Sequence, residues 1–330
     1  MDNGKPPISD LERDPKLQVA RVKYPGGEYK EFDVDRGSEG SDLFRQVTAG
    51  MKYSLGERKH FALSFEDPFD GTSYLIKNDS TIATQLNAPE IWRRFQNKDY
   101  NEYGLPTRRE KSVFPSWHFS FEVILYPKET YTLVDDLARY YMFMQIQEDI
   151  MTGRLPATTE IHTRLGALVA QLQFGDAPTE MTEEYRAFMS KSKLVPDSVV
   201  DPEVHLKIAE HHTQLRDVTA TEAQNMYMNI CKNLPLYGLH YFSAKDEEDR
   251  DVSVGIGAVG INIYHNGNIL KSFPLGEYNW EPRRNQFLIC LKNAQRDDQN
   301  SKATIDFVDH GHARRLSDCT SRYTSYYKTE

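Results

Sequence analysis

The sequence predicts a multi-domain α+β protein in which a helical segment lies between two β-rich segments. Apolar residues alternate with polar ones near each end, whereas between them they recur every three or four positions. A chain of 330 residues is long enough for two or three domains. The expected segments are a flexible tail (1–16), a first β-rich lobe (17–86), an inserted linker (87–116), a strand leading into a helical bundle (117–234) and a second β-rich lobe (235–330).

The composition excludes several classes of protein. A net charge of −9 disfavours a general nucleic-acid-binding protein. No apolar run approaches the roughly 18 residues of a membrane-spanning helix, and the first residues do not resemble a signal peptide. Three cysteines without close pairing fit a reducing compartment. We therefore expect a cytoplasmic protein with no disulfide bond, no transmembrane segment and no nucleic-acid partner.

The first lobe follows the order strand, strand, helix, strand, strand. Alternating apolar residues flank the turn Pro25-Gly26-Gly27, and a helix is predicted over 41–53. Two further alternating runs lie at 61–65 and 74–76. This is the element order of ubiquitin-like domains. The segment 87–116 has no periodicity, and alternation returns at 119–125.

The middle lobe is organised around the stretch from Tyr126 to Pro156. Thr132 is the predicted N-cap, Gly153 the predicted C-terminal stop, and Pro156 prevents continuation. Such a helix would span roughly 30 Å at 1.5 Å per residue. Its apolar residues cover two sides, so we expect it to be the buried central helix of the bundle.

Three later signals define the remaining helices. An apolar stripe over 161–172 ends at Gly175, and 176–200 has the composition of a loop. Asp201-Pro202 is a cap followed by proline at the first helical position. Thr219 and Glu222 form a capping box ahead of a stripe that includes Met226, Ile230 and Cys231.

The last lobe returns to the spacing of strands. Short alternating runs follow Leu239, an acidic turn occupies 246–249, and the final apolar residues, from Ala313 to Tyr323, have helical spacing. Several antiparallel strands followed by one helix resemble a pleckstrin-homology or phosphotyrosine-binding sandwich.

Two motifs resemble the FERM domain of the band 4.1 superfamily. The resemblance covers about 17–327 and implies a three-lobed cloverleaf: a ubiquitin-like lobe, an acyl-CoA-binding-protein-like helical bundle and a pleckstrin-like sandwich with a C-terminal helix. The first motif comprises Tyr126-Pro127, Arg139-Tyr140, Gln145-Ile146, Asp149-Ile150 and Gly153-Arg154-Leu155-Pro156. The second comprises His212, Glu222-Ala223, Tyr227-Met228, Cys231, Leu234 and Tyr237-Gly238.

The sequence departs from the family at several positions. Leu275 stands where the family has Trp, the 87–116 segment is longer than usual, and the family's His-His-x-Phe-Phe ending is missing. Pro282 lies in the strand whose edge pairs with partner peptides in this family. Because proline has no amide hydrogen, we expect it to alter peptide docking at that edge.

The resemblance implies a non-catalytic adaptor without cofactors. Its implied partners are cytoplasmic tails of membrane proteins, phosphoinositides or other anionic lipids, and cytoskeletal or scaffold proteins at the plasma membrane. Lys77 and Lys292 match the lipid site, and 277–284 with the helix 310–327 match the peptide groove. The predicted groove residues are Glu277, Tyr278, Trp280, Arg283, Arg284, Arg314, Arg315, Leu316 and Cys319. The four arginines are expected to form a positive patch on an acidic protein.

One alternative function and one modification site stay open. The chain could be the targeting domain of a larger enzyme, such as a FERM-containing tyrosine phosphatase. Ser112 follows the basic run Arg108-Arg109-Glu110-Lys111 and is a candidate phosphorylation site, against the alternative of an inert linker.

Three further patterns resemble catalytic or metal sites. Gly255, Gly257 and Gly260 match a dinucleotide fingerprint, but the residues after them alternate as a strand rather than opening a helix. Cys290 and Arg296 have phosphatase spacing, but Cys290 lies in an apolar strand. The histidine pairs 211–212 and 310–312 lack further ligands, so no metal site is predicted.

Overall fold

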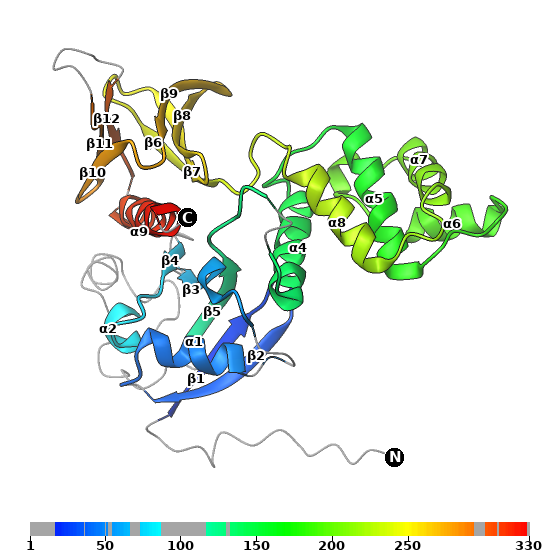
Figure 1. Ribbon diagram of the computed structural model, residues 1–330, viewed down its shortest axis with the longest axis horizontal. Coiled ribbons are helices and arrows are strands. Elements are labelled where there is room, and N and C mark those ends of the chain that lie inside the picture. Colours follow the sequence, from blue (N-terminus) through cyan, green and yellow to red (C-terminus); the bar gives the residue numbers. More distant parts are fainter. Residues whose placement is uncertain are drawn as a thin grey trace, which may run out of the picture. The chain divides into compact units, whose positions relative to one another are not determined.

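The computed structural model describes residues 17–35, 37–49, 51, 55–66, 73–86, 117–129, 133–293, 301–308 and 310–328. Two compact units form (Figure 1). The first contains the described residues of 1–54 and 62–122, and the second contains those of 55–61 and 123–330.

The first unit is a five-stranded sheet with one main helix. The strands lie in the order β2-β1-β5-β3-β4, with β1 antiparallel to β2 and parallel to β5. Leu43 and Val47 of the helix are fully buried, and the Val47 carbonyl accepts a hydrogen bond from the Tyr24 hydroxyl. The elements are β1 (Leu17–Lys23), β2 (Tyr29–Asp35), α1 (Gly40–Ala49), β3 (Phe61–Glu66), β4 (Ser73–Leu75), α2 (Ile82–Leu86) and β5 (Trp117–Val123).

Two expectations for this region need correction. The helix predicted over 41–53 is shorter and ends at Ala49. The strand at 117–123 does not belong to the helical bundle, because β5 lies between β1 and β3 and completes the first sheet. Periodicity identifies this strand but cannot assign its partners, because pairing between segments this far apart leaves no local signal.

The helical part of the second unit contains five helices among its described residues. They are α4 (Asp136–Met151), α5 (Thr159–Phe174), α6 (Glu183–Lys191), α7 (Pro202–Thr213) and α8 (Ala220–Cys231). The predicted caps are confirmed at Asp201, which accepts from the amides of Glu203 and Val204, and at Thr219 and Glu222, which form the capping box. Gly175 caps α5 as predicted, with a positive φ of 72°.

Three predictions for the bundle are wrong. Asp135, not Thr132, is the N-cap of α4; its side chain accepts from the Ala138 amide, so the helix is a turn shorter. The segment 176–200 contains α6, which begins at the N-cap Thr182. In the predicted stripe of α8, Met226 is exposed and Ile230 only half-buried, although Cys231 is buried as predicted, together with Tyr227 and Met228.

The last part of the second unit is a curved seven-stranded antiparallel sheet, of order β10-β11-β12-β6-β7-β8-β9. Helix α9 (His310–Lys328) packs against it and buries Leu316, Cys319 and Tyr323 completely (Figure 1). The strands are β6 (His240–Lys245), β7 (Asp251–Gly257), β8 (Gly260–His265), β9 (Asn268–Pro274), β10 (Tyr278–Arg283), β11 (Gln286–Leu291) and β12 (Lys302–Asp306).

A cluster of tyrosines joins this sheet and helix to the bundle within the second unit. The amide of Tyr126 donates to the Tyr323 hydroxyl (3.2 Å), which donates to the carbonyl of Gly238 (3.1 Å). The Tyr126 hydroxyl donates to Asp149 of α4 (3.2 Å). The linker before α4, the linker before β6 and the end of α9 are thus held at one point.

Candidate functional site

The open edge formed by β10 is the structural feature that corresponds to the predicted peptide site. Among the described residues, strand β10 is the terminal strand of the seven-stranded sheet and pairs with β11 alone. Helix α9 packs against both strands. An edge strand carries backbone donors and acceptors that another chain can use for pairing.

The register fixes which backbone groups of β10 face outward. Antiparallel partners alternate between pairs that exchange hydrogen bonds and pairs that do not. The Lys292 amide donates to the Glu277 carbonyl (2.8 Å), and Arg283 pairs with Gln286 across the hairpin. Odd-numbered residues of β10 therefore bond to β11, and the even-numbered ones, 278, 280 and 282, direct their amides and carbonyls outward.

Pro282 therefore removes a donor from the open edge and not from the ladder with β11. Its partner in register is Phe287, in a pair that exchanges no hydrogen bonds. The edge consequently offers the amides of Tyr278 and Trp280 together with the carbonyls of Tyr278, Trp280 and Pro282. A docked strand can pair fully near Trp280 but loses one bond at Pro282.

Several predicted groove residues are core residues instead. Tyr278 is 2% exposed, Leu316 and Cys319 are completely buried, and Arg315 is 9% exposed. Alternation along β10 and helical spacing along α9 place these residues on the correct faces of the two elements. The two faces pack against each other, however, so the side chains are buried between β10 and α9. Trp280 is half-buried against the Tyr278 ring, with 5.9 Å between ring centroids, whereas Glu277 is exposed.

The predicted positive patch is largely neutralised. Arg283 donates twice to Glu281, at 2.9 and 3.1 Å, and Arg314 lies 4.0 Å from Asp318. The ion pair raises the pKa of Arg283 and lowers the pKa of Glu281, because each charge stabilises the other. Arg284 is exposed on the hairpin and Arg315 is buried. The arginines therefore do not act together as one cationic surface.

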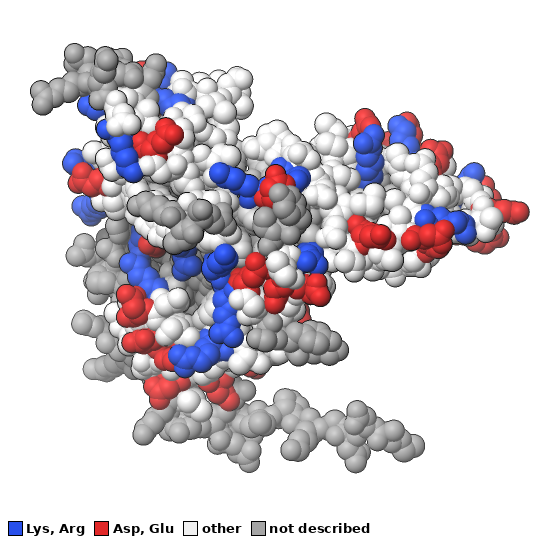
Figure 2. All heavy atoms as spheres, in the orientation of Figure 1, with Lys and Arg blue, Asp and Glu red and all other residues white. Residues whose placement is uncertain are grey.

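Charge pairing is also the rule on the helical bundle. Figure 2 shows basic and acidic side chains interspersed over its surface. Arg164 pairs with Glu160 at 2.6 Å, and Lys207 pairs with Glu203 at 2.6 Å. These exposed pairs at helical spacing add little stability but leave no uniform field for an anionic partner.

The two predicted lipid-binding lysines lie in different units. The side chain of Lys77 is exposed in the first unit, and its backbone is held by the buried Gln85, which both accepts from its amide (2.7 Å) and donates to its carbonyl (2.9 Å). Lys292, in the second unit, donates from Nζ to the Gly276 carbonyl (2.6 Å). A joint role for the two residues stays a prediction.

The remaining motifs are described only in part. The three glycines lie in the β7–β8 hairpin, as predicted. Cys290 is half-buried in β11, and Arg296 and Ser112 lie outside the described residues. The buried His212 contacts Tyr185, Gln171 and the Gly175 carbonyl.

Metal-binding and membrane-spanning features are also missing from the described part of the chain. Across the described ranges, no three His, Cys, Asp or Glu side chains are placed to hold a metal ion. Among the helices that the structure describes, none combines the length and apolar character that a bilayer crossing requires.

Comparisons with known proteins agree with the observed architecture. The model of the FERM central domain matches residues 128–242. Protein 4.1 homolog of Drosophila melanogaster is 25% identical over 97% of this chain, and Band 4.1-like protein 3 of Homo sapiens is 26% identical over 98%. The chain spans only 17% and 27% of these relatives' own lengths.

Solved structures show the same fold at lower identity. The Drosophila Merlin structure, a complex of FERM and C-terminal domains, has a TM-score of 0.74, with 18% identity over 94% of this chain and 96% of that chain. The human Myosin 7b MyTH4-FERM domain in complex with harmonin-a PDZ3 has a TM-score of 0.64, with 14% identity over 94% of this chain and 60% of that chain.

Proposed function

Because this chain is a FERM domain of the band 4.1 superfamily, we propose that it is a non-catalytic adaptor. It holds cytoplasmic tails of membrane proteins at the plasma membrane and connects them to cytoskeletal or scaffold proteins. The two similar structures support a binding role, since each contains a FERM domain in complex with another protein domain.

The observation that carries the proposal is the outward-facing backbone of β10. An extended tail segment would add a strand beside Tyr278 and Trp280 and would lie between the edge and helix α9. Main-chain pairing supplies affinity, while the half-buried indole of Trp280 provides an apolar contact. Pro282 has no amide hydrogen to donate, so main-chain pairing with the tail ends there and the recognised segment is short.

Changing the backbone donors of this edge tests the proposal. Synthetic tails of single-span membrane proteins are first screened on an array, and the tightest binder is titrated by fluorescence anisotropy. Trp280→Pro removes an outward donor, and Trp280→Ala controls for loss of the ring. Pro282→Ala restores a donor. Each hydrogen bond is expected to change affinity by about threefold.

The direction of the affinity change in each variant shows whether the tail pairs with β10. Trp280→Pro should bind more weakly than Trp280→Ala, and Pro282→Ala should bind more tightly than the unaltered chain. Pro282→Ala guards against misfolding, since a damaged protein does not gain affinity. Equal affinities across all four proteins, or an array without any bound tail, would exclude β10 as the docking edge.

Binding to anionic lipid is the second half of the proposal. Lys77 supports it, because its ammonium is exposed and meets no carboxylate among the described residues. We expect Lys77→Glu to reduce co-sedimentation with phosphoinositide vesicles severalfold, since a basic contact near an anionic surface contributes about 1 kcal/mol. Lys207→Glu, on the bundle, is the charge-matched control. Equal sedimentation with neutral vesicles would contradict the lipid role.

A further inference from the structure

The outer face of strands β6, β7 and β8 carries a groove on a different part of the seven-stranded sheet from the β10 edge. It encloses about 750 Å³, and its lining includes Tyr241, Ser243 and Lys245 of β6, Asp251 of β7, Tyr264 of β8 and Asp306 of β12. We call this feature the outer-face groove. It lies wholly within the second unit.

Gly255 lies beneath the two tyrosine rings of the outer-face groove. Tyr241 pairs with Gly255 across β6 and β7, and the rings of Tyr241 and Tyr264 lie 5.5 Å apart, tilted by 40°. A Cβ on Gly255 would lie 3.2 Å from Tyr264 Cε2 and 3.4 Å from Tyr241 Cζ. The missing side chain thus lets both rings lie over the strand, which gives a structural reason for part of the glycine motif.

The other end of the groove has an excess of negative charge. Lys245 pairs with Asp306 in register on one side and with Asp251 on the other. Its ammonium already contacts Asp249 at 2.9 Å. Three carboxylates therefore belong to residues that pair with Lys245 in register or by charge, and neither Asp251 nor Asp306 forms an ion pair with a described residue.

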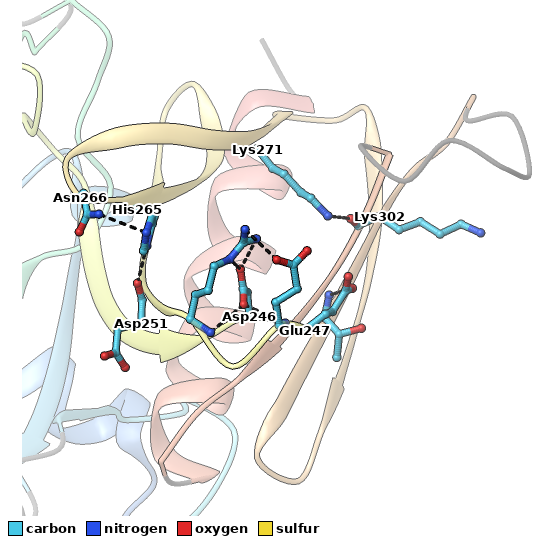
Figure 3. A network of polar contacts seen from close by, with 10 residues as sticks. Asp246, Glu247, Asp251, His265, Asn266, Lys271 and Lys302 are labelled. Carbon is cyan, nitrogen blue, oxygen red and sulfur yellow. Dashed lines mark hydrogen bonds and ion pairs between the residues drawn. The ribbon is translucent and has the colours of Figure 1, made fainter.

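Two neighbouring cations contact groups outside the lining of the groove. Arg250 pairs with Asp246 (2.6 Å) and Glu248 (2.8 Å), and the Lys271 ammonium donates to the Lys302 carbonyl (2.6 Å) (Figure 3). Asp306 accepts from the Gln286 amide (2.7 Å), a contact that leaves its charge in place. The groove therefore joins an aromatic end to an acidic end.

We propose that the outer-face groove binds a basic, extended peptide segment of a partner protein. An arginine or lysine side chain would lie with its aliphatic part over the tyrosine rings and its cation near Asp251 and Asp306. Aromatic faces and carboxylates both attract cations, and arginine suits both kinds of contact. An apolar residue of the same segment would contact Leu236 and the exposed Val308.

The test uses the whole chain and a fluorescent peptide of alternating arginine and leucine, with alternating glutamate and leucine as the control peptide. The double variant Asp251→Asn/Asp306→Asn should bind the basic peptide about tenfold more weakly, the equivalent of about 1.4 kcal/mol. Glu184→Gln/Glu210→Gln removes two exposed charges from the bundle and should change affinity by less than about twofold.

Two further variants test whether the basic peptide binds in the outer-face groove or at the β10 edge. Gly255→Val should weaken binding by displacing the rings, and Trp280→Pro should leave it unchanged, because that variant alters only the β10 edge. The proposal is overturned if the basic peptide fails to bind, if the acidic peptide binds equally, if both double variants behave alike, or if Trp280→Pro abolishes binding. Failure of tail docking at β10 would leave this result unaffected.

Discussion

At the scale of single residues, Tyr126 connects several parts of the second unit. Its backbone and side chain contact Tyr323, Asp149 and Gly238 through hydrogen bonds or close packing. Burial raises the pKa of Asp149, while the Arg154 guanidinium at 2.8 Å opposes that shift. Residues of the two sequence motifs, among them Tyr126, Asp149 and Gly238, thus meet at one junction.

Substituting Gly238 tests this junction. Gly238 has a φ of +63°, and a Cβ there would lie 2.6 Å from Tyr126 Cβ. Gly153 has a φ of +76°, but a Cβ there would meet nothing within 4 Å, so Gly153→Ala measures the backbone effect alone. We expect the free energy of unfolding to fall by about 1 kcal/mol for Gly153→Ala and about 3 kcal/mol for Gly238→Ala.

Urea unfolding of both variants provides the measurement. The steric part of the effect is the difference between the two glycines, because both substitutions carry the same left-handed backbone penalty. Equal losses of stability at the two positions would mean that Tyr126 moves without difficulty and that the junction is not tightly packed.

At the scale of elements, both edges of the seven-stranded sheet are limited by proline. Pro282 faces outward on β10, and the Leu275 amide donates to the Val259 carbonyl, so Pro274 of β9 occupies the outward-facing register in the same way. A bulge near Tyr264 also interrupts the pairing of β9 with β8. Such features restrict uncontrolled strand pairing, and on β10 they confine the proposed docking edge to a short stretch.

Helix α6, which the sequence pattern did not predict, belongs to the same scale. Its N-cap Thr182, followed by Glu183 and Glu184, is a normal helix start, but only Met189 is buried within it. A short helix that packs through so few residues has a weak apolar stripe, and the nearby prolines and glycines dominate the sequence signal. Its packing against α7 stabilises it in the folded chain.

At the scale of the whole molecule, buried histidines link stability to pH. Burial lowers the pKa of both His162 and His212 below the usual 6.5. The unfolded chain therefore binds more protons than the folded chain just below pH 6.5, and the free energy of unfolding decreases as the pH falls through that window. Each histidine contributes about 1.4 kcal/mol per unit of lowered pKa.

Denaturation at about pH 7.5 and about pH 5.5, on either side of the ordinary histidine pKa, measures this linkage. His212→Gln keeps a hydrogen-bonding side chain near Gln171 and Gly175 but cannot be protonated, so its stability should depend less on pH. His211→Gln, one position away and half-buried, is the control. A variant at His212 with the same pH dependence as the unaltered chain would show that this histidine is not the sensor.

The sequence by itself determined the features that depend on neighbouring residues. The capping residues Asp201, Thr219 and Glu222, the stop at Gly175 and the hairpin at Gly255–Gly260 follow from local geometry, and the structure confirms them. The order of β-rich, helical and β-rich segments follows from periodicity in the same way, because side-chain spacing reports local conformation directly.

Only the tertiary structure decided which segments meet. It placed β5 between β1 and β3, buried Leu316 and Cys319 under the sheet, and directed Pro282 toward the open edge. Each of these features depends on strand register or on contacts between distant segments. Register and distant contacts leave the local spacing of apolar and polar residues unchanged, so the sequence pattern does not reveal them. The two proposed binding surfaces depend on such contacts, so neither can be identified from the sequence alone.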